Sequence, residues 1–122
     1  MATQPFNTSV LRAKTLCSQQ LSATTATTVY TTPSAGCAKI GSGTVCNTSA
    51  ASVNVTVAVV PSGSTDDGTH TVIYKYPLAA GDTLPLTPLA GFMLGASDFV
   101  SVTASTANVI DVVISGTEGL AS

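Results

Sequence analysis

Valine alternates with smaller or polar residues through the middle of the chain. Four valines share one side of this pattern: Val53, Val55, Val57 and Val59. The other side carries Ser52, Asn54 and Thr56. A two-residue period is typical of a β-strand with one buried face and one more solvated face, so a strand is predicted here.

The rest of the chain consists of short apolar-rich runs divided by turn residues, at about the 8–12-residue spacing of a sandwich or barrel. The runs cover 15–23, 25–33, 37–46, 71–76, 84–86, 98–105 and 109–115. No helix longer than one turn is predicted. We therefore expect an all-β fold, an antiparallel two-sheet sandwich or jelly roll of about eight strands.

The same alternation predicts the core. The residues expected to be buried between two sheets are Val55, Val57, Tyr74, Val100, Val102, Val112 and Ile114. The last two runs are joined by a short Ser-Thr-Ala-Asn segment and are predicted to pair as a hairpin. Gly41 and Gly43 indicate a bend or bulge inside the run 37–46.

A chain of 122 residues is most simply one domain. Residues 1–9 are polar, interrupted by Pro5 and without a period, so they are expected to form an extended arm. Residues 10–122 are expected to form a single β-sandwich domain. Phe6 is a large apolar side chain on the arm, and we expect it to contact a neighbouring subunit.

Charge is scarce: 8% of the residues are charged and the net charge is −2. Ser and Thr together supply 34 residues. There is no basic stripe of the kind that binds a phosphate backbone. No apolar run reaches the ~18 residues that cross a bilayer, and the start lacks the order of a secretory signal. Neither nucleic acid nor a membrane is therefore expected as a partner.

His70 is the single histidine and follows Asp66 and Asp67. One interpretation is a general base oriented by a carboxylate. The favoured one is a residue at the edge of a loop, because a triad also needs a nucleophile and none can be placed here. The segment 65–69 lacks the spaced acidic positions of a calcium loop. No catalytic residue, cofactor site or metal site is predicted.

Three cysteines, Cys17, Cys37 and Cys46, favour free thiols over a disulfide framework. If 37–46 is one unbroken strand, Cys37 and Cys46 point to opposite faces and cannot meet. If Gly-Ser-Gly at 41–43 is a hairpin turn, they could come close. Buried, inert thiols are favoured, because Cys is among the most buried residue types.

Asp111 lies among apolar residues in the sequence VIDVVIS. It is interpreted as a residue at the sheet rim, a paired carboxylate or a contact with a neighbouring subunit, and a catalytic role is disfavoured because no partner acid is found. Asp82 and Asp98 are expected to close turns by accepting backbone N–H bonds. The tyrosines, which could stack on sugars, are assigned to core or interface packing instead.

Four successive segments carry a resemblance that covers about residues 24–116. They are TTVYTTPSAG, VCNTSAASVNVTVAVVPSG, VIYKYPLAAGDTLPL and GASDFVSVTASTANVIDVVISG. Together they resemble small β-sandwich structural proteins of tailed bacteriophages, which occur as capsid decoration proteins and as tail or fibre accessory modules. The resemblance implies no catalytic residues, and it implies a continuous strand where this chain has CAKIGSGTVC.

The expected function is therefore a non-enzymatic virion structural protein, in first place a capsid decoration protein that stabilises the shell. The alternative is a tail, baseplate or fibre accessory protein with a receptor- or carbohydrate-binding β-sandwich. The expected partners are further copies of the chain, in a symmetric oligomer such as a trimer, and the major capsid protein. The expected location is the capsid surface of the virion, after assembly in the host cytoplasm.

Overall fold

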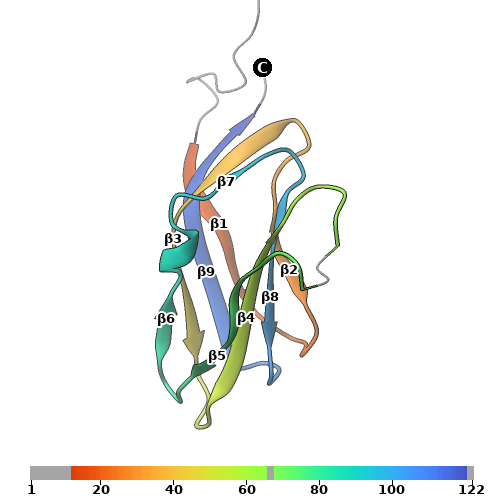
Figure 1. Ribbon diagram of the computed structural model, residues 1–122. Helices are drawn as coiled ribbons and strands as arrows, with labels where there is room; N and C mark the ends of the chain where they lie inside the picture. The colour runs from red at the N-terminus through yellow and green to blue at the C-terminus, as the bar shows by residue number, and fades with distance from the viewer. Residues whose placement is uncertain (1–11, 66–67, 121–122) are drawn as a thin grey trace, which may run out of the picture.

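The structure is a computed structural model that describes residues 12–65 and 68–120 (Figure 1). Its strands are β1 (Arg12–Gln20), β2 (Thr27–Thr31), β3 (Gly36–Asn47), β4 (Val53–Val60), β5 (Thr71–Leu78), β6 (Thr83–Pro85), β7 (Met93–Leu94), β8 (Phe99–Ala104) and β9 (Ile110–Leu120). A 3-10 turn, η2 (Thr87–Leu89), lies between β6 and β7. No helix within the described ranges is long and apolar enough to span a membrane.

Two antiparallel sheets form a sandwich (Figure 1), which confirms the predicted fold class. Sheet A has the order β1-β9-β3-β6, with the short β7 also paired to β3. Sheet B has the order β2-β8-β4-β5. The start of β1 and the end of β9 lie at the same end of the sandwich, because Arg12 pairs with Glu118.

The strand pairing is that of a jelly roll. The strands pair as in one long hairpin that is rolled into two sheets. The innermost pair is β4–β5, followed outward by β3 with β6 and β7, then β2–β8, and finally β1–β9. Apart from β4 to β5 and β6 to β7, each successive strand crosses to the other sheet. This is the arrangement of an eight-stranded jelly roll, with β6 and β7 as two parts of one edge strand.

The core lies between the facing sides of the two sheets. Six of the seven residues predicted to be buried are 0% exposed: Val55, Val57, Val100, Val102, Val112 and Ile114. Each contributes roughly 1.5–3 kcal/mol of transfer free energy when it leaves water. The period-two pattern of the valine strand therefore identified the correct inward face.

Tyr74 is the seventh predicted core residue, and that prediction is wrong, because 70% of its side chain is exposed. It lies on β5, the edge strand of sheet B, whose pairing with β4 shifts register twice between Val55 and Ala58. Lys75 adopts a positive φ of 45°. These irregularities break the alternation along β5, so parity in the sequence does not predict which side chains face inward.

The predicted hairpin between the last two runs is also wrong. β8 pairs with β2 and β4 in sheet B, whereas β9 pairs with β1 and β3 in sheet A. The connecting segment is therefore an arch between sheets, with Asn108 at a positive φ of 63°. Both strands still send the predicted residues into the core, because alternation encodes a face and not a partner.

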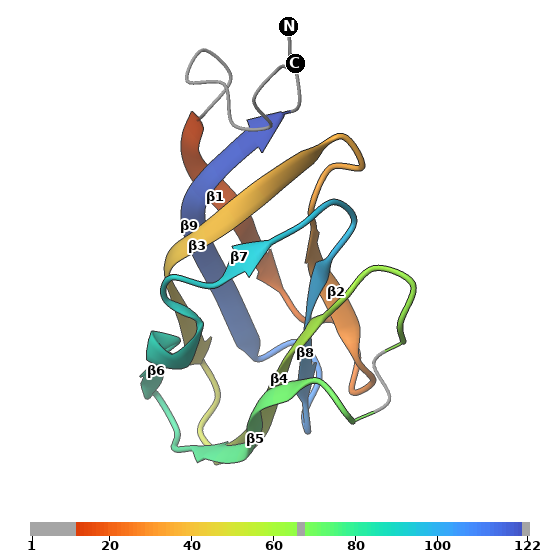
Figure 2. The same ribbon diagram turned by 45° about the horizontal axis from the view of Figure 1, so that its top comes forward.

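Sheet A bends part-way along β9, which pairs with β1 on one side and β3 on the other (Figure 2). The register shifts in β1 between Thr15 and Cys17 and in β3 between Ile40 and Ser42, and both shifts lie opposite Ser115. β3 is nevertheless continuous, as the resemblance implied, and the bulge at Gly41 confirms the bend expected from the glycines.

Asn47 ties together the loops at the other end of the sandwich. Its side chain is 0% exposed, and its Nδ2 donates to the carbonyl oxygens of Ala51 at 2.8 Å and Leu78 at 3.0 Å. Its Oδ1 accepts the backbone N–H of Ser49 at 2.9 Å. This network fixes the start of β4 against the end of β5, because a buried amide is stable only when its polar atoms are paired.

Candidate functional site

The residues expected to contact neighbouring subunits are Phe6 and Asp111. Phe6 and the rest of the expected arm lie outside the described residues. Asp111 is half-buried on β9, between Cys46 and Gln20 of the adjacent strands. Gln20 Nε2 donates to Asp111 Oδ1 at 3.1 Å, so this carboxylate is paired on the outer face of sheet A.

No acid–base constellation forms around His70 within the described part of the chain. His70 is half-buried just before β5, and its backbone carbonyl accepts the N–H of Val59 at 3.1 Å. Asp66 and Asp67 lie outside the described residues. Across residues 12–65 and 68–120, no three His, Cys, Asp or Glu side chains gather as metal ligands would.

The three thiols are free and differ in exposure. Cys17 is buried with its Sγ 3.8 Å from the carbonyl oxygen of Val112, and burial raises the pKa of this thiol. Cys37 and Cys46 are partly exposed at opposite ends of β3. The bulge at Gly41 exchanges the inward and outward positions of β3, so both cysteines lie on the outer face of sheet A. At ~3.3 Å per residue they are roughly 30 Å apart and cannot bond within one chain.

The expectation of opposite faces for these two cysteines is thus wrong, although the conclusion that they do not meet holds. Ala38 and Ile40 are buried before the bulge, and Val45 is buried after it. One extra residue lies between the two sets, which moves the even positions outward in the second half of the strand. The expectation that all three thiols are buried holds for Cys17 alone.

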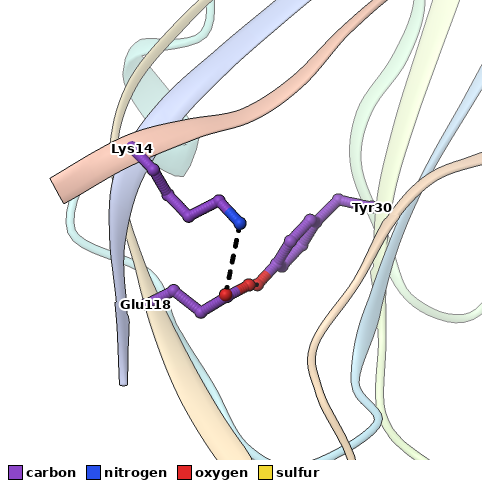
Figure 3. Close-up of polar contacts among 3 residues, drawn as sticks. All are labelled: Lys14, Tyr30 and Glu118. Carbon is purple, nitrogen blue, oxygen red and sulfur yellow. Dashed lines mark hydrogen bonds and ion pairs between the residues drawn. The ribbon is translucent and has the colours of Figure 1, made fainter. Parts of the chain in front are cut away.

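A polar cluster joins the two sheets at the end where β1 begins (Figure 3). The hydroxyl of Tyr30, on β2, donates to Glu118 Oε2 at 2.6 Å, and Lys14 Nζ lies 3.3 Å from Glu118 Oε1. Burial, and then the hydrogen bond with Glu118, raise the pKa of Tyr30 well above its ordinary value. The phenol therefore remains a neutral donor, and the cluster is a structural tie between sheets.

The turn aspartates divide into two cases. Asp98 accepts the backbone N–H of Gly95 at 2.8 Å and that of Ser62 at 2.8 Å, which confirms the expected role. The side chain of Asp82 accepts no hydrogen bond from a described residue. Its turn is closed by the backbone instead, with the N–H of Asp82 donating to the carbonyl of Ala79 at 3.0 Å.

The outer face of sheet A is a broad surface with few charges, and we call it the sheet A face. Its outward residues are Thr15, Ser18, Gln20, Cys37, Lys39, Ser42, Thr44, Cys46, Asp111, Val113, Ser115 and Thr117. Val113 is 42% exposed near its centre, and Met93 on the adjoining β7 is 68% exposed. Two shallow hollows of about 140 and 120 Å³ open beside Ser42 and Gly43.

The outer face of sheet B carries a groove of about 300 Å³, which we call the sheet B groove. It is lined by Thr24, Asn54, Thr56, Lys75, Thr103, Ala104 and Ser105. Sequence reasoning did not identify it, although the polar positions of β4 and β8 that alternate with buried residues were visible. The groove exists because β4 and β8 are neighbours, and that pairing is not encoded locally.

No family model matches the sequence, and no curated protein is significantly similar to it. A chain of the cyanophage Pam1 capsid asymmetric unit shares the fold, with a TM-score of 0.52 and 16% identity, over 98% of this chain and 93% of that one. A chain of the Bacillus endospore appendages, described as a novel family of disulfide-linked pili, has a TM-score of 0.54 and 16% identity over 93% and 90%. The structural overlap shows a shared fold, and at 16% identity it shows the fold alone.

Proposed function

We propose that this chain is a non-enzymatic structural protein of a phage virion and decorates the outside of the capsid. The observation that carries the proposal is the fold match with a chain of a cyanophage capsid asymmetric unit, which covers nearly the full length of both chains. The jelly-roll topology supports it, because this fold recurs in viral capsid proteins. The proposed location is the capsid surface, after assembly in the host cytoplasm.

The sheet A face supports a role in assembly. Lys39 and Asp111 are the two charged residues among those that define it. A surface of hydroxyl and apolar groups gives little long-range steering and suits close contact that depends on shape. The proposed partners of this face are further copies of the chain, in a symmetric oligomer such as a trimer, and the major capsid protein.

A decoration protein must discriminate a finished lattice from loose subunits. Contacts to several neighbouring capsid subunits, each weak alone, exist together only after assembly. An oligomer that makes them simultaneously gains affinity through effective concentration, without any single strong contact. Phe6, on the expected arm of residues 1–9, is proposed to dock on a neighbouring subunit and Asp111 to lie at a subunit contact.

The test adds the purified protein to particles that lack it and follows binding together with DNA release on heating. The expected result is saturable binding at a copy number comparable with that of the major capsid protein, and DNA release at a higher temperature. Unassembled major capsid protein should bind far more weakly. Deletion of residues 1–9 should lower incorporation and leave the thermal stability of the domain unchanged.

Two results would contradict decoration. Binding at a few sites on the tail would favour the tail, baseplate or fibre accessory function. Binding to shells without any change in heat resistance would remove the stabilising role.

A self-assembling filament is a second candidate function. Two observations favour it: the fold match to a chain of disulfide-linked pili, and the partly exposed Cys37 and Cys46 at opposite ends of one strand. Copies stacked end to end could join these thiols, with molecular oxygen accepting the two electrons and two protons that each new disulfide releases. Electrophoresis without reductant decides, because a ladder that collapses to the monomer on reduction would support the filament.

A further inference from the structure

The sheet B groove has a floor of polar side chains on rigid strands. Asn54 and Thr56 alternate with buried valines on β4, and Thr103 lies between two buried residues on β8. Their side chains therefore point out of the sandwich from the two central strands of sheet B. Groups held on central strands keep their relative positions better than groups on loops.

The hydroxyls of this floor are already oriented. Ser105 Oγ accepts the backbone N–H of Asn54 at 2.9 Å, and Thr56 Oγ1 accepts the backbone N–H of Lys75 at 3.0 Å. A hydroxyl that accepts a backbone N–H keeps its own hydrogen for donation outward. The amide of Asn54 and the hydroxyl of Thr103 have no hydrogen-bond partner among the described residues. The groove thus offers two oriented hydroxyls and two further polar side chains that are available to a ligand.

Lys75 gives the groove a positive charge. It alone is charged among the described lining residues, and it forms no ion pair with a described carboxylate. Its Nζ lies 5.3 Å from the centroid of the Tyr74 ring, which is 70% exposed. Its φ of 45° is a conformation that residues with side chains rarely adopt, and such strain is found disproportionately at ligand sites.

We propose that the sheet B groove binds one carboxylated sugar residue, of the uronic or sialic acid type, within a glycan chain. The volume of about 300 Å³ is at the lower end for ligand sites and accommodates a single sugar ring. Asn54, Thr56 and Thr103 bind the sugar hydroxyls. Lys75 pairs with the carboxylate.

This inference is independent of the capsid role, because it concerns a different face and is tested on the isolated protein. The experiment is an NMR titration with glucuronate, followed at the backbone amides. The expected result is a saturable shift centred on residues 54–56, 75 and 103–105. Glucose, acetate and phosphate, which each lack one part of the ligand, should bind more weakly by about tenfold or more.

The deciding variant is Lys75→Asn, because Asn tolerates a positive φ and removes the charge. It should weaken glucuronate binding by about tenfold or more with an unchanged Tm. Lys39→Asn, which removes an exposed lysine from the sheet A face, is the matched control and should bind as the parent protein does. Thr103→Val removes one groove hydroxyl without changing the shape of the side chain and should also weaken binding.

Several outcomes would overturn the proposal. One is the absence of any saturable shift with glucuronate. Another is binding of glucose as tight as that of glucuronate. A third is equally tight binding of acetate or phosphate, which would indicate a plain anion site. An equal loss in Lys39→Asn would do the same, because it would show a general charge effect. If Lys75→Asn lowers the Tm, Thr103→Val decides, and full retention of binding in that variant counts against the groove.

Discussion

Sheet A and sheet B are both irregular, and the irregularities lie in different parts of the two sheets. In sheet A the irregularity is central, because β1 and β3 both bulge against β9 close to Ser115 and Gly116. In sheet B the irregularities lie at the two edges. β2 shifts register against β8 between Thr28 and Tyr30, and β5 slips twice against β4, where Lys75 adopts a positive φ. The other pairing of β4, with β8, keeps its register throughout.

The position of each irregularity decides which residues it tolerates. A Cβ at Gly116 would clash with the backbone carbonyl of Lys39, so the central bulge requires glycine. The edge strand has solvent on one side, and it accommodates exposed Tyr74 and a lysine in a strained conformation. A central irregularity is therefore part of the packing, whereas an edge irregularity is available for contacts outside the chain.

The largest expected effect separates the centre of sheet B from its edge. Val57→Asp should abolish folding, because it buries an unpaired carboxylate at a position that is 0% exposed. Tyr74→Asp is the matched change on the edge strand and should alter the free energy of unfolding by about 0.5 kcal/mol or less. Circular dichroism and thermal melting measure both. An unchanged Tm for Val57→Asp would show that the inward face of β4 has been misassigned.

The next effect tests the central bulge of sheet A. Gly116→Ala should destabilise by about 3 kcal/mol, because the backbone of Lys39 cannot move away without breaking the β3–β9 ladder. Gly41→Ala is the control from the same bulge, since its added Cβ would approach the carbonyl oxygen of Ser115 at an ordinary 3.4 Å. Urea denaturation gives both values. Equal costs for the two variants would mean that the bulge is not tightly packed.

A smaller effect concerns the tie between the sheets. Tyr30→Phe should cost about 1 kcal/mol at neutral pH, because the partly buried hydrogen bond to Glu118 is lost. Since the pKa of Tyr30 is raised in the folded state, its contribution is fully present below the ordinary tyrosine pKa of about 10 and is lost as the pH rises beyond it.

Unfolding curves measured between neutral and strongly alkaline pH should therefore show a steeper loss of stability for the parent protein than for Tyr30→Phe. Tyr74→Phe changes an exposed tyrosine and should follow the parent curve. If Tyr30→Phe and the parent protein lose stability in parallel, the Tyr30 phenol does not link folding to pH.

The smallest effect concerns the thiols. Cys37 and Cys46 should react with a thiol reagent in the native protein. Cys17 should react only after unfolding, because burial shields this thiol and raises its pKa in the folded state. All three thiols are predicted to be reduced in the assembled state, so reductant should leave the Tm unchanged. Quantitative labelling after denaturation without reductant checks this, and one free thiol per chain would indicate a disulfide.

Local patterning predicted much of the fold but little of the candidate sites. The alternation in β4 and the apolar positions of β8 and β9 identified their buried faces, because burial of one face imposes a two-residue period whatever the partner strand is. The sheet A face and the sheet B groove combine residues from strands far apart in sequence. Their composition follows from pairing that no single segment specifies.

The sequence by itself determined that the chain is all-β, which faces of its central strands are buried, and that the 37–46 segment bends at its glycines. Backbone preference and the hydrophobic effect act locally, so they can be read locally. Tertiary structure alone decided that β8 and β9 enter different sheets, that Tyr74 lies outside, and that Cys37 and Cys46 share a face. The first depends on which strands pair. The other two depend on register, because a one-residue bulge reverses the face of every side chain beyond it.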